Sequence, residues 1–485
     1  MNITIFEKSS FIGGRSTTVD AWNDPNSGLP IELGASIFVK ANEILVNATE
    51  EFELSTDGPD DGGMRGLLGI WDGEKFVFTQ SQRSSKWWDI TKLLWKYGYS
   101  VIRANNLMNA TVGRFMNMYK APYFPFRSLS ETAQHLDLHR STGLTGAQLL
   151  KENKIYAPFT TDIIQAATRV NYGQNLGIIH GLETMVCLAA EGAMQIDGGN
   201  WQIFAHMALA SNATILLNTA VSGIERGENR KYALNSESLV SSPARRTTLT
   251  QEFDSIVLAA PLQFSNIKLG IDVVNKIPDE IPYVRLHVTL FASPNTLSGK
   301  YFGLKEGAEV PDVVLTTTPP GQDMSDENDI VGKAGFFSIS TLRYAVFAPE
   351  NDARDEPQNI YKIFSPAPIT ADQLSSLFDI ERSTLPDDLD DLVENPTTHV
   401  SWFYPKVWYS YPYEYPRVTF EDIELAESLY YTSGMESFIS TMETNALMGK
   451  NVARLIMDDY LLENEGFPHT EKEEQAVIDY QELKI

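Results

Sequence analysis

Apolar and polar residues alternate with two different periods along this chain, and the changes of period mark the elements it should form. Ile3 to Phe6 is a short apolar run rich in β-forming residues, which predicts a strand. The run L-L-G-I-W-D-G-E-K-F-V-F predicts two strands joined by a tight turn at Asp72-Gly73. Helical spacing appears between residues 41 and 54, and again from Trp87 to Tyr119, where aromatic residues and leucine are frequent.

Strands dominate the rest of the chain, with a few helices between them. The run A-T-I-L-L-N-T-A-V-S-G-I-E predicts one strand, and residues 253–262 predict a buried strand ended by proline. Asn200 is expected to cap a helix that starts near Trp201. Alternation between residues 283 and 345 predicts an antiparallel sheet. The last element is predicted to be a strand, a turn at Gly434 and a long helix.

Length and charge narrow the classes of protein that remain. A chain of 485 residues with 43% hydrophobic residues is long enough for two or three globular domains. Its formal net charge of −26 argues against a nucleic-acid partner, and against docking on anionic lipid by charge alone. The sequence has no run of 18 apolar residues, so we predict no transmembrane helix.

Cysteine and histidine give little support for thiol or metal chemistry. Cys187 is the only cysteine, and its apolar setting M-V-C-L-A-A predicts a buried, inert thiol. His135 and His139 have the spacing of one helix face, for which a solvated face is the favoured interpretation, so we predict no metal site. N-glycosylation sequons permit a secretory route and occur at Asn2, Asn47, Asn109 and Asn212.

The first candidate chemistry lies near the N-terminus. Glu7 stands at the C-terminal end of the first predicted strand, where an acidic residue of a dinucleotide-binding unit accepts hydrogen bonds from the adenosine ribose. Gly13-Gly14 allows a tight backbone turn beside a phosphate, and Arg15 supplies a cation there. Gly34-Ala35 provides a second point where a ligand can approach the backbone closely.

This arrangement resembles the FAD-binding domain of the amine-oxidase-like flavoproteins, which carry a glutamate, then G-G-R, then an E-x-G-A strand. A buried strand with a glycine turn is the alternative interpretation. The G-x-G-x-x-G turn of the same unit should lie about 25 residues before the glutamate. Only six residues precede Glu7, and no G-x-G-x-x-G follows a strand and opens a helix further along. We therefore expect a fragment that begins at the second strand; a relative that has lost the first unit is the alternative.

An ordered series of motifs resembles the prenylcysteine oxidases. The series runs from about residue 3 to about residue 459 and includes V-N-Y-G-Q at 170–174, D-G-G-N at 197–200, D-S-I-V-L-A-A-P-L at 254–262, V-L-T-T at 314–317, I-F-S-P-A-P-I-T-A-D-Q-L at 363–374, Y-S-Y-P at 409–412 and G-M-E-S at 434–437. Each motif is weak alone, and their order makes the resemblance specific.

The resemblance implies an enzyme that oxidises farnesyl- or geranylgeranyl-cysteine with FAD and oxygen. Hydride leaves the carbon between the sulfur and the alkene for the flavin, and water then adds. The products are a prenyl aldehyde, cysteine and hydrogen peroxide. The protein's task is positioning and desolvation, and no catalytic side chain is assigned. The alternatives are a non-catalytic chain that no longer holds FAD, and a flavin enzyme acting on an amine or a polyene.

The resemblance also implies which residues form the site. A turn and a helix N-terminus would bind the flavin ring and ribityl chain, and the backbone near one strand residue would face the adenine. The cofactor-binding positions carried over are Glu7, Gly13, Gly14, Arg15, Gly34, Ala35, Val221, Gly434, Glu436, Thr441 and Met442. The expected substrate pocket contains Tyr172, Trp408 and Tyr411, for each of which plain aromatic core is the competing interpretation.

The implied fold is α/β, with a Rossmann-like FAD domain and an α+β substrate domain. The expected boundaries are 1–57, 195–270 and 425–460 for the FAD domain, 58–194 and 271–424 for the substrate domain, and 461–485 for an acidic tail. The resemblance further implies a vacuolar, lysosomal or secretory location, with peripheral contact to a membrane.

Overall fold

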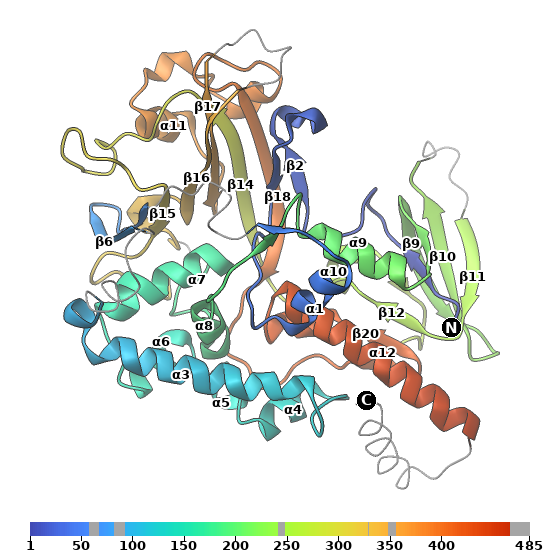
Figure 1. Ribbon diagram of the computed structural model, residues 1–485. Helices are drawn as coiled ribbons and strands as arrows, with labels where there is room; N and C mark the ends of the chain where they lie inside the picture. The colour runs from blue at the N-terminus through green and yellow to red at the C-terminus, as the bar shows by residue number, and fades with distance from the viewer. Residues whose placement is uncertain (58–66, 82–92, 241–247, 328, 348–355, 466–485) are drawn as a thin grey trace.

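The computed structural model describes residues 1–57, 67–81, 93–240, 248–327, 329–347 and 356–465 (Figure 1). In this view a large sheet stands at the top, a group of helices lies at the lower left, and a smaller sheet that contains β9, β10 and β11 stands at the right. The predicted helix from Trp87 begins outside the described residues. Helical structure is present at 93–97 and continues in α3 (Tyr99–Phe115).

The large sheet has seven strands in the order β18-β14-β17-β16-β15-β5-β6. Their bounds are β5 (Leu67–Trp71), β6 (Phe76–Ser81), β14 (Tyr283–Ser293), β15 (Val313–Thr316), β16 (Ser338–Val346), β17 (Gln358–Ser365) and β18 (Trp402–Pro412). β14 pairs antiparallel with β17 and β18, and β15 with β16, which confirms the predicted antiparallel sheet. β15 also pairs with β5 in parallel, which the sequence did not predict.

Both faces of the central strand β14 are covered, so its residues are buried almost without interruption. One face packs against α11 (Ala371–Phe378), where the ring of Phe291 lies 5.2 Å from Tyr361 and 5.7 Å from Phe378. The other face carries Leu286 and Val288 into a second core cluster.

The predicted hairpin near the start of this sheet is confirmed. β5 and β6 pair antiparallel, and Gly73 has the positive φ of 93° that the turn requires. Asp72 accepts hydrogen bonds from the backbone N–H groups of Glu74 and Lys75, both at 2.9 Å. The side chain of Asp72 therefore closes the turn, as short acidic residues do.

Outside the large sheet, three of the described strand pairs are parallel, and each lies in a different sheet. β1 (Thr4–Phe6) pairs with β8 (Thr214–Leu216), β12 (Ile256–Leu258) pairs with β20 (Leu429–Tyr431), and β13 pairs with β9. The remaining short strands are β2 (Thr18–Asp20), β3 (Pro30–Glu32), β4 (Thr56–Asp57), β7 (Gln195–Ile196), β9 (Thr219–Arg226), β10 (Tyr232–Ser238), β11 (Thr248–Phe253), β13 (Lys268–Leu269) and β19 (Glu424–Ala426). The unit at the right of Figure 1 is formed by β9, β10 and β11.

The single strand predicted over residues 213–225 is wrong. The chain forms β8, then turns at Leu217 and Asn218, and continues as β9 in a different sheet. Asn218 has a φ of 50°, a left-handed conformation that asparagine tolerates better than most residues. The break separates two apolar runs that look continuous in the sequence.

The helices pack mainly at the lower left of Figure 1 and along the C-terminal segment. The remaining bounds are α1 (Glu43–Glu51), α4 (Leu129–His135), α5 (His139–Thr142), α6 (Gly146–Glu152), α7 (Gln165–Tyr172), α8 (Gly181–Leu188), α9 (Trp201–Ala210), α10 (Leu262–Ser265) and α12 (Met442–Glu465). His135 ends one helix and His139 begins the next, so they do not share a helix face as the spacing predicted. Asp137 between them has a φ of 54°, which breaks the helix.

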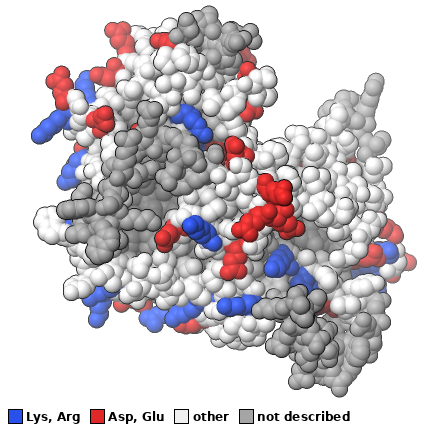
Figure 2. Space-filling view, viewed as in Figure 1, with Lys and Arg blue, Asp and Glu red and all other residues white. Residues whose placement is uncertain are grey.

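Helix α12 extends to Glu465, into the stretch predicted as an acidic tail, and residues 466–485 lie outside the described residues. None of the helices within the described ranges combines the length and apolar character that a membrane span needs. On the face shown in Figure 2, acidic side chains gather in one central group and basic ones are scattered around them. The boundaries of the two expected domains stay a prediction.

Candidate functional site

Glu7 lies where parallel strand β1 ends. Its backbone N–H donates to the carbonyl of Leu216, and its carbonyl accepts from the N–H of Thr219, both at 2.9 Å. Its carboxylate Oε1 accepts the N–H of Ser9 at 2.6 Å, and the side chain is half-buried. The backbone is therefore fixed, and the carboxylate is held at the strand end, where a ribose would be recognised.

The Gly13-Gly14 segment forms a tight turn that only glycine fits. The N–H of Ser16 donates to the carbonyl of Gly13 at 2.9 Å, and the two glycines have φ values of 137° and 59°. A Cβ atom on Gly13 would lie 2.4 Å from the Ser16 carbonyl oxygen, whereas one on Gly14 would meet nothing within 4 Å. Gly14 therefore presents its backbone to open space, as a turn beside a phosphate requires.

The side chain of Arg15, which the sequence placed beside a phosphate, is bound to other groups of the protein. Its Nη2 lies 2.7 Å from Oε1 of Glu436, and its Nη1 donates to the carbonyl of Ser410 at 2.5 Å. The hydroxyl of Tyr283 donates to the other carboxylate oxygen of Glu436 at 3.1 Å. We call this group the Arg15–Glu436–Tyr283 junction; it ties the N-terminal turn to the C-terminal segment and to β14.

Gly34 and Ala35 lie beside this junction. A Cβ atom on Gly34 would lie 2.4 Å from the carbonyl oxygen of Arg15 and 2.8 Å from the ring of Trp408. The carbonyl of Ala35 accepts the side-chain amide of Asn200 at 2.9 Å. Trp408, predicted for the substrate pocket, therefore packs directly on a segment predicted to bind the cofactor.

Asn200 does not cap α9 as predicted. Its side chain makes no capping bond; its Oδ1 accepts the N–H of Ile196 at 2.9 Å instead. Its backbone N–H donates to Oε1 of Glu32 at 2.6 Å. The residue therefore joins the D-G-G-N turn to the strand that precedes Gly34, a long-range role that local sequence does not reveal.

A buried lysine, which sequence reasoning missed, lies next to the same segment. The ammonium of Lys362 on β17 donates to the carbonyl of Glu32 at 2.6 Å and to Oγ of Ser36 at 3.0 Å. Burial lowers the pKa of Lys362 to about 8, although the nearby carboxylate of Glu32 opposes this. Burial raises the pKa of Glu32 to about 7, opposed by the N–H of Asn200 and by Lys362.

The C-terminal positions occupy a 3₁₀ turn and the start of α12. Gly434 and Glu436 lie in the turn Ser433–Ser437. The Oγ1 of Thr441 accepts the N–H of Thr444 at 3.1 Å, which caps the helix. Among the described residues, the N–H groups of Met442 and Glu443 have no hydrogen-bond acceptor. The positive end of this long helix is thus available to an anionic or carbonyl oxygen.

Two of the predicted pocket residues are buried together elsewhere. The rings of Tyr172 and Tyr411 are 5.3 Å apart, and both pack near Cys187. Cys187 is buried, as predicted, and burial raises its pKa well above the ordinary thiol value. Val221 lies on β9, half-buried in the core of that sheet with Ile224.

Behind these aromatic residues lies a cluster of buried acids. Burial raises the pKa of Glu183 to about 8 and that of Glu414 well above its ordinary value. Burial lowers the pKa of His180 to about 3. His180 Nδ1 accepts the N–H of Glu183 at 3.1 Å, so the neutral ring carries its proton on Nε2, 3.4 Å from the Glu414 carboxyl.

A cavity of about 290 Å³ opens next to the Arg15–Glu436–Tyr283 junction. Tyr283 belongs to both: its hydroxyl donates to Glu436, and the residue is among those that line the cavity. The apolar lining comes from Val284, Ile330, Val331, Phe337 and Pro366. The other lining residues are Gly173, Arg285, Glu327, Asp329 and Tyr413.

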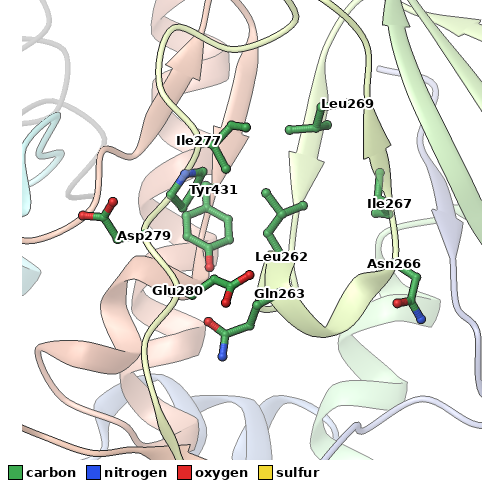
Figure 3. Close-up of a pocket in the computed structure, with 10 residues that line it drawn as sticks. Leu262, Gln263, Asn266, Ile267, Leu269, Ile277, Asp279, Glu280 and Tyr431 are labelled. Atoms are coloured by element: carbon green, nitrogen blue, oxygen red, sulfur yellow. The ribbon is translucent and has the colours of Figure 1, made fainter.

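A second cavity, of about 300 Å³, lies beside Tyr431 at the end of β20 (Figure 3). Tyr431 from β20 faces Leu262 and Gln263 of α10 across it, and Asp279 and Glu280 form part of its rim. The side-chain amide of Gln263 binds both the N–H and the carbonyl of Ile281, at 2.9 and 2.7 Å. This polar group is therefore already satisfied and holds the cavity wall.

Comparison with known proteins places this geometry in a family. The family model described as prenylcysteine lyase matches residues 80–466. The chain is 28% identical over 476 residues to farnesylcysteine lyase of Arabidopsis thaliana, covering 95% of this chain and 82% of that protein. It is 25% identical over 474 residues to prenylcysteine oxidase 1 of Mus musculus, covering 94% and 83%.

Solved structures share the fold at low sequence identity. Cyclohexylamine oxidase from Brevibacterium oxydans has a TM-score of 0.52 and 15% identity, covering 94% of this chain and 93% of that one. A fatty acid isomerase from P. acnes has a TM-score of 0.54 and 13% identity, covering 93% and 92%. These values show the α/β fold of amine oxidase structures, and the family model decides the membership. The chain belongs to the prenylcysteine lyase family.

Proposed function

We propose that this protein is an FAD-dependent oxidase that cleaves the thioether of a prenylated cysteine. The overall reaction consumes prenylcysteine, one water and one oxygen molecule, and it yields a prenyl aldehyde, free cysteine and hydrogen peroxide. Family membership over residues 80–466 supports the reaction class. The names of the similar proteins, farnesylcysteine lyase and prenylcysteine oxidase 1, support the substrate class.

The position of Tyr283 carries this proposal. Its hydroxyl contacts Glu436, a predicted cofactor-binding residue, and the residue is also among those that line the 290 Å³ cavity. Apolar residues and charged residues both line this cavity, which suits an amphiphilic substrate. A thioether bound there would lie one side chain away from the segment that the family resemblance assigns to the flavin.

The residues present fit FAD at its adenosine end and at its flavin end. The carboxylate of Glu7 ends a parallel strand, which suits the adenosine ribose. The N–H groups of Met442 and Glu443 lack acceptors at the start of α12, which suits a flavin carbonyl. Gly14 faces open space and would suit a phosphate. We infer that these residues hold FAD when it is bound.

Bound FAD would supply a two-electron acceptor that oxygen can regenerate. The chain's own contribution is to orient the substrate and exclude water. The Arg15–Glu436–Tyr283 junction holds Tyr283 by its hydroxyl, which fixes the end of β14 next to the cavity. The allylic carbon next to sulfur is the most easily oxidised carbon of the substrate, so positioning can suffice without a strong base.

Two other functions have specific support and different expected products. The separate sheets of β1 and β12 favour a non-catalytic prenyl-binding protein. The fold shared with cyclohexylamine oxidase favours an amine as substrate. A prenyl-binding protein would bind farnesylcysteine and leave it intact, and an amine oxidase would release ammonia from an amine.

The decisive experiment supplies the purified protein with FAD, farnesylcysteine and oxygen. Farnesal, cysteine and peroxide should appear in equal amounts, and omission of FAD should abolish all three. Cyclohexylamine and a polyunsaturated fatty acid serve as competing substrates. Turnover of either of these without farnesal would overturn the thioether assignment and retain the flavin.

We also propose a vacuolar, lysosomal or secretory location, with peripheral contact to a membrane. The family resemblance supports this location, and the sequons at Asn2, Asn47, Asn109 and Asn212 permit a secretory route. Protein isolated from its native cell should migrate faster on a gel after glycosidase treatment. An unchanged mobility would show that none of the four sequons carries a glycan and would contradict a secretory route.

A further inference from the structure

The 290 Å³ cavity has a buried apolar end and an exposed charged rim. Gly173, Val284 and Phe337 line it and are all buried, whereas the lining residues Arg285 and Glu327 are exposed. An apolar chain that enters from the rim therefore ends against Gly173 and its two neighbours.

Gly173 leaves room at this buried end because it has no side chain. It ends helix α7 in the left-handed conformation, with a φ of 59°. A Cβ atom on Gly173 would lie 3.2 Å from Cγ1 of Val284 and 3.3 Å from the ring of Phe337. Both distances are shorter than an ordinary contact between carbon atoms, so a methyl group there would press on two side chains that line the cavity.

One wall of the cavity is fixed by two side chains that flank Gly173 in the sequence. Nη2 of Arg169 and Nδ2 of Asn175 both donate to the carbonyl of Ile330, at 2.6 and 3.0 Å. Nε of Arg169 also donates to Oδ1 of Asn175 at 2.8 Å, and both side chains are fully buried. Ile330 lines the cavity, so this network holds its wall in place.

The opposite wall is fixed by Gln174. Its side-chain amide donates to the carbonyl of Pro412 at 3.0 Å and accepts the N–H of Glu414 at 2.8 Å. These two bonds lie on either side of Tyr413, which lines the cavity. Because both walls are held by the segment around Gly173, the cavity cannot easily widen to absorb an added methyl group.

We propose that Gly173 determines the length of the prenyl chain that this cavity accepts. The glycine keeps the buried end open, and Val284 and Phe337 form its floor. At about 290 Å³ the cavity lies at the lower end of small-molecule pockets, which typically hold about 300–1,000 Å³, so little spare volume remains. This role rests on the proposed function and adds a determinant of substrate length to it.

Calorimetric binding under nitrogen, without turnover, tests this role. The ligands are S-geranyl-, S-farnesyl- and S-geranylgeranyl-L-cysteine, titrated below their micellar concentrations. Gly173→Ala should weaken binding of the farnesyl ligand by about 10-fold, roughly the effect of two methylene groups that are no longer buried. The shorter geranyl ligand does not reach the floor, so its affinity should change by less than about 2-fold.

The matched control is Gly28→Ala. Gly28 has a φ of 63°, and a Cβ atom on it would meet nothing within 4 Å, so this variant carries the backbone strain without the contact. It should leave all three affinities unchanged. Adding Val284→Ala to Gly173→Ala removes the Cγ1 atom that the new methyl meets, and should restore part of the farnesyl affinity. Val284→Ala alone should shift the preference toward the geranylgeranyl ligand.

An equal loss for the geranyl and farnesyl ligands in Gly173→Ala would overturn the proposal, as would unchanged affinities or a wild type that binds none of the ligands. If Gly173→Ala does not fold, an unchanged preference in Val284→Ala overturns it. A preference that shifts as expected, without oxidation by the protein supplied with FAD, would support the role of Gly173 and reject the proposed oxidase. Oxidation of farnesylcysteine with a chain-length preference that Gly173→Ala leaves unchanged would do the reverse.

Discussion

Arg15 and Glu436 form an ion pair of 2.7 Å that joins the turn at Gly13-Gly14 to the 3₁₀ turn Ser433–Ser437. The side chain of Glu436 is almost fully buried, whereas 33% of the side-chain surface of Arg15 is exposed. Tyr283 and the Ser410 carbonyl complete the hydrogen bonds of the pair. The contact therefore joins both predicted cofactor segments to Tyr283, which is among the residues that line the 290 Å³ cavity.

Replacing Glu436 with leucine should destabilise the protein by about 2 kcal/mol, because it leaves Arg15 and Tyr283 without their buried partner. The exposure of Arg15 keeps the effect below that of a fully buried pair. Urea unfolding followed by tryptophan fluorescence measures the change. Flavin occupancy should fall with it.

The matched control is Glu74→Leu, which removes the partner of Lys333 from an exposed pair and should leave the urea midpoint unchanged. The double variant Arg15→Met with Glu436→Leu should recover part of the loss, since neither charge then remains unpaired. If the double variant is less stable than the sum of the two single changes predicts, the pair is not what stabilises this junction.

Local patterns predicted the hairpin at Asp72-Gly73 and the helix at Glu43–Glu51 because neighbouring residues decide both. The Arg15–Glu436 contact could not be predicted, because it depends on tertiary folding that brings distant segments together. From the sequence alone, Lys362 would be a polar position of a half-exposed strand. It is buried because both faces of β17 are covered in the folded protein. The motif series predicted the family and the α/β fold, both of which are confirmed, whereas the roles of the site residues stay a prediction.

The stability of the protein should fall as the pH rises through the titration of Glu32. Its pKa is about 7 in the folded state and 4.5 ordinarily, so the folded state binds the extra proton within this window. Stability from this group is therefore complete below pH 4.5 and lost by pH 7, a change of about 3 kcal/mol. Comparison of wild type with Glu32→Gln by urea unfolding isolates the effect, and parallel curves for the two would contradict it.

Cys187 should be unreactive in the folded protein. It is buried and its pKa is raised by burial, so little thiolate forms and reagents cannot reach it. A chromogenic disulfide reagent should detect no thiol in buffer and one thiol per chain in urea. Rapid labelling of the native protein would show that the helix α8 opens locally.

Gly34→Ala should destabilise the protein strongly, whereas Gly14→Ala should cost only backbone strain. The added methyl on Gly34 would lie 2.4 Å from the Arg15 carbonyl oxygen, a backbone atom that cannot move freely. The methyl on Gly14 meets nothing, and its φ of 59° costs about 1 kcal/mol. Thermal unfolding of the two variants side by side tests the order, and an equal loss in both would contradict the packing described at Gly34.

The last prediction concerns the affinity for FAD. We expect the adenosine and flavin ends of the cofactor to contribute separately to binding. Glu7 should bind the ribose, because its carboxylate ends strand β1.

Flavin fluorescence quenching with FAD and with riboflavin separates these contributions. Glu7→Gln should weaken FAD binding by about 10-fold, since one charged hydrogen-bonded contact is lost, and should leave riboflavin binding unchanged. The control Glu53→Gln removes a negative charge from an exposed position and should affect neither ligand. An equal loss for both ligands in Glu7→Gln would show that Glu7 acts on the fold and not on the ribose.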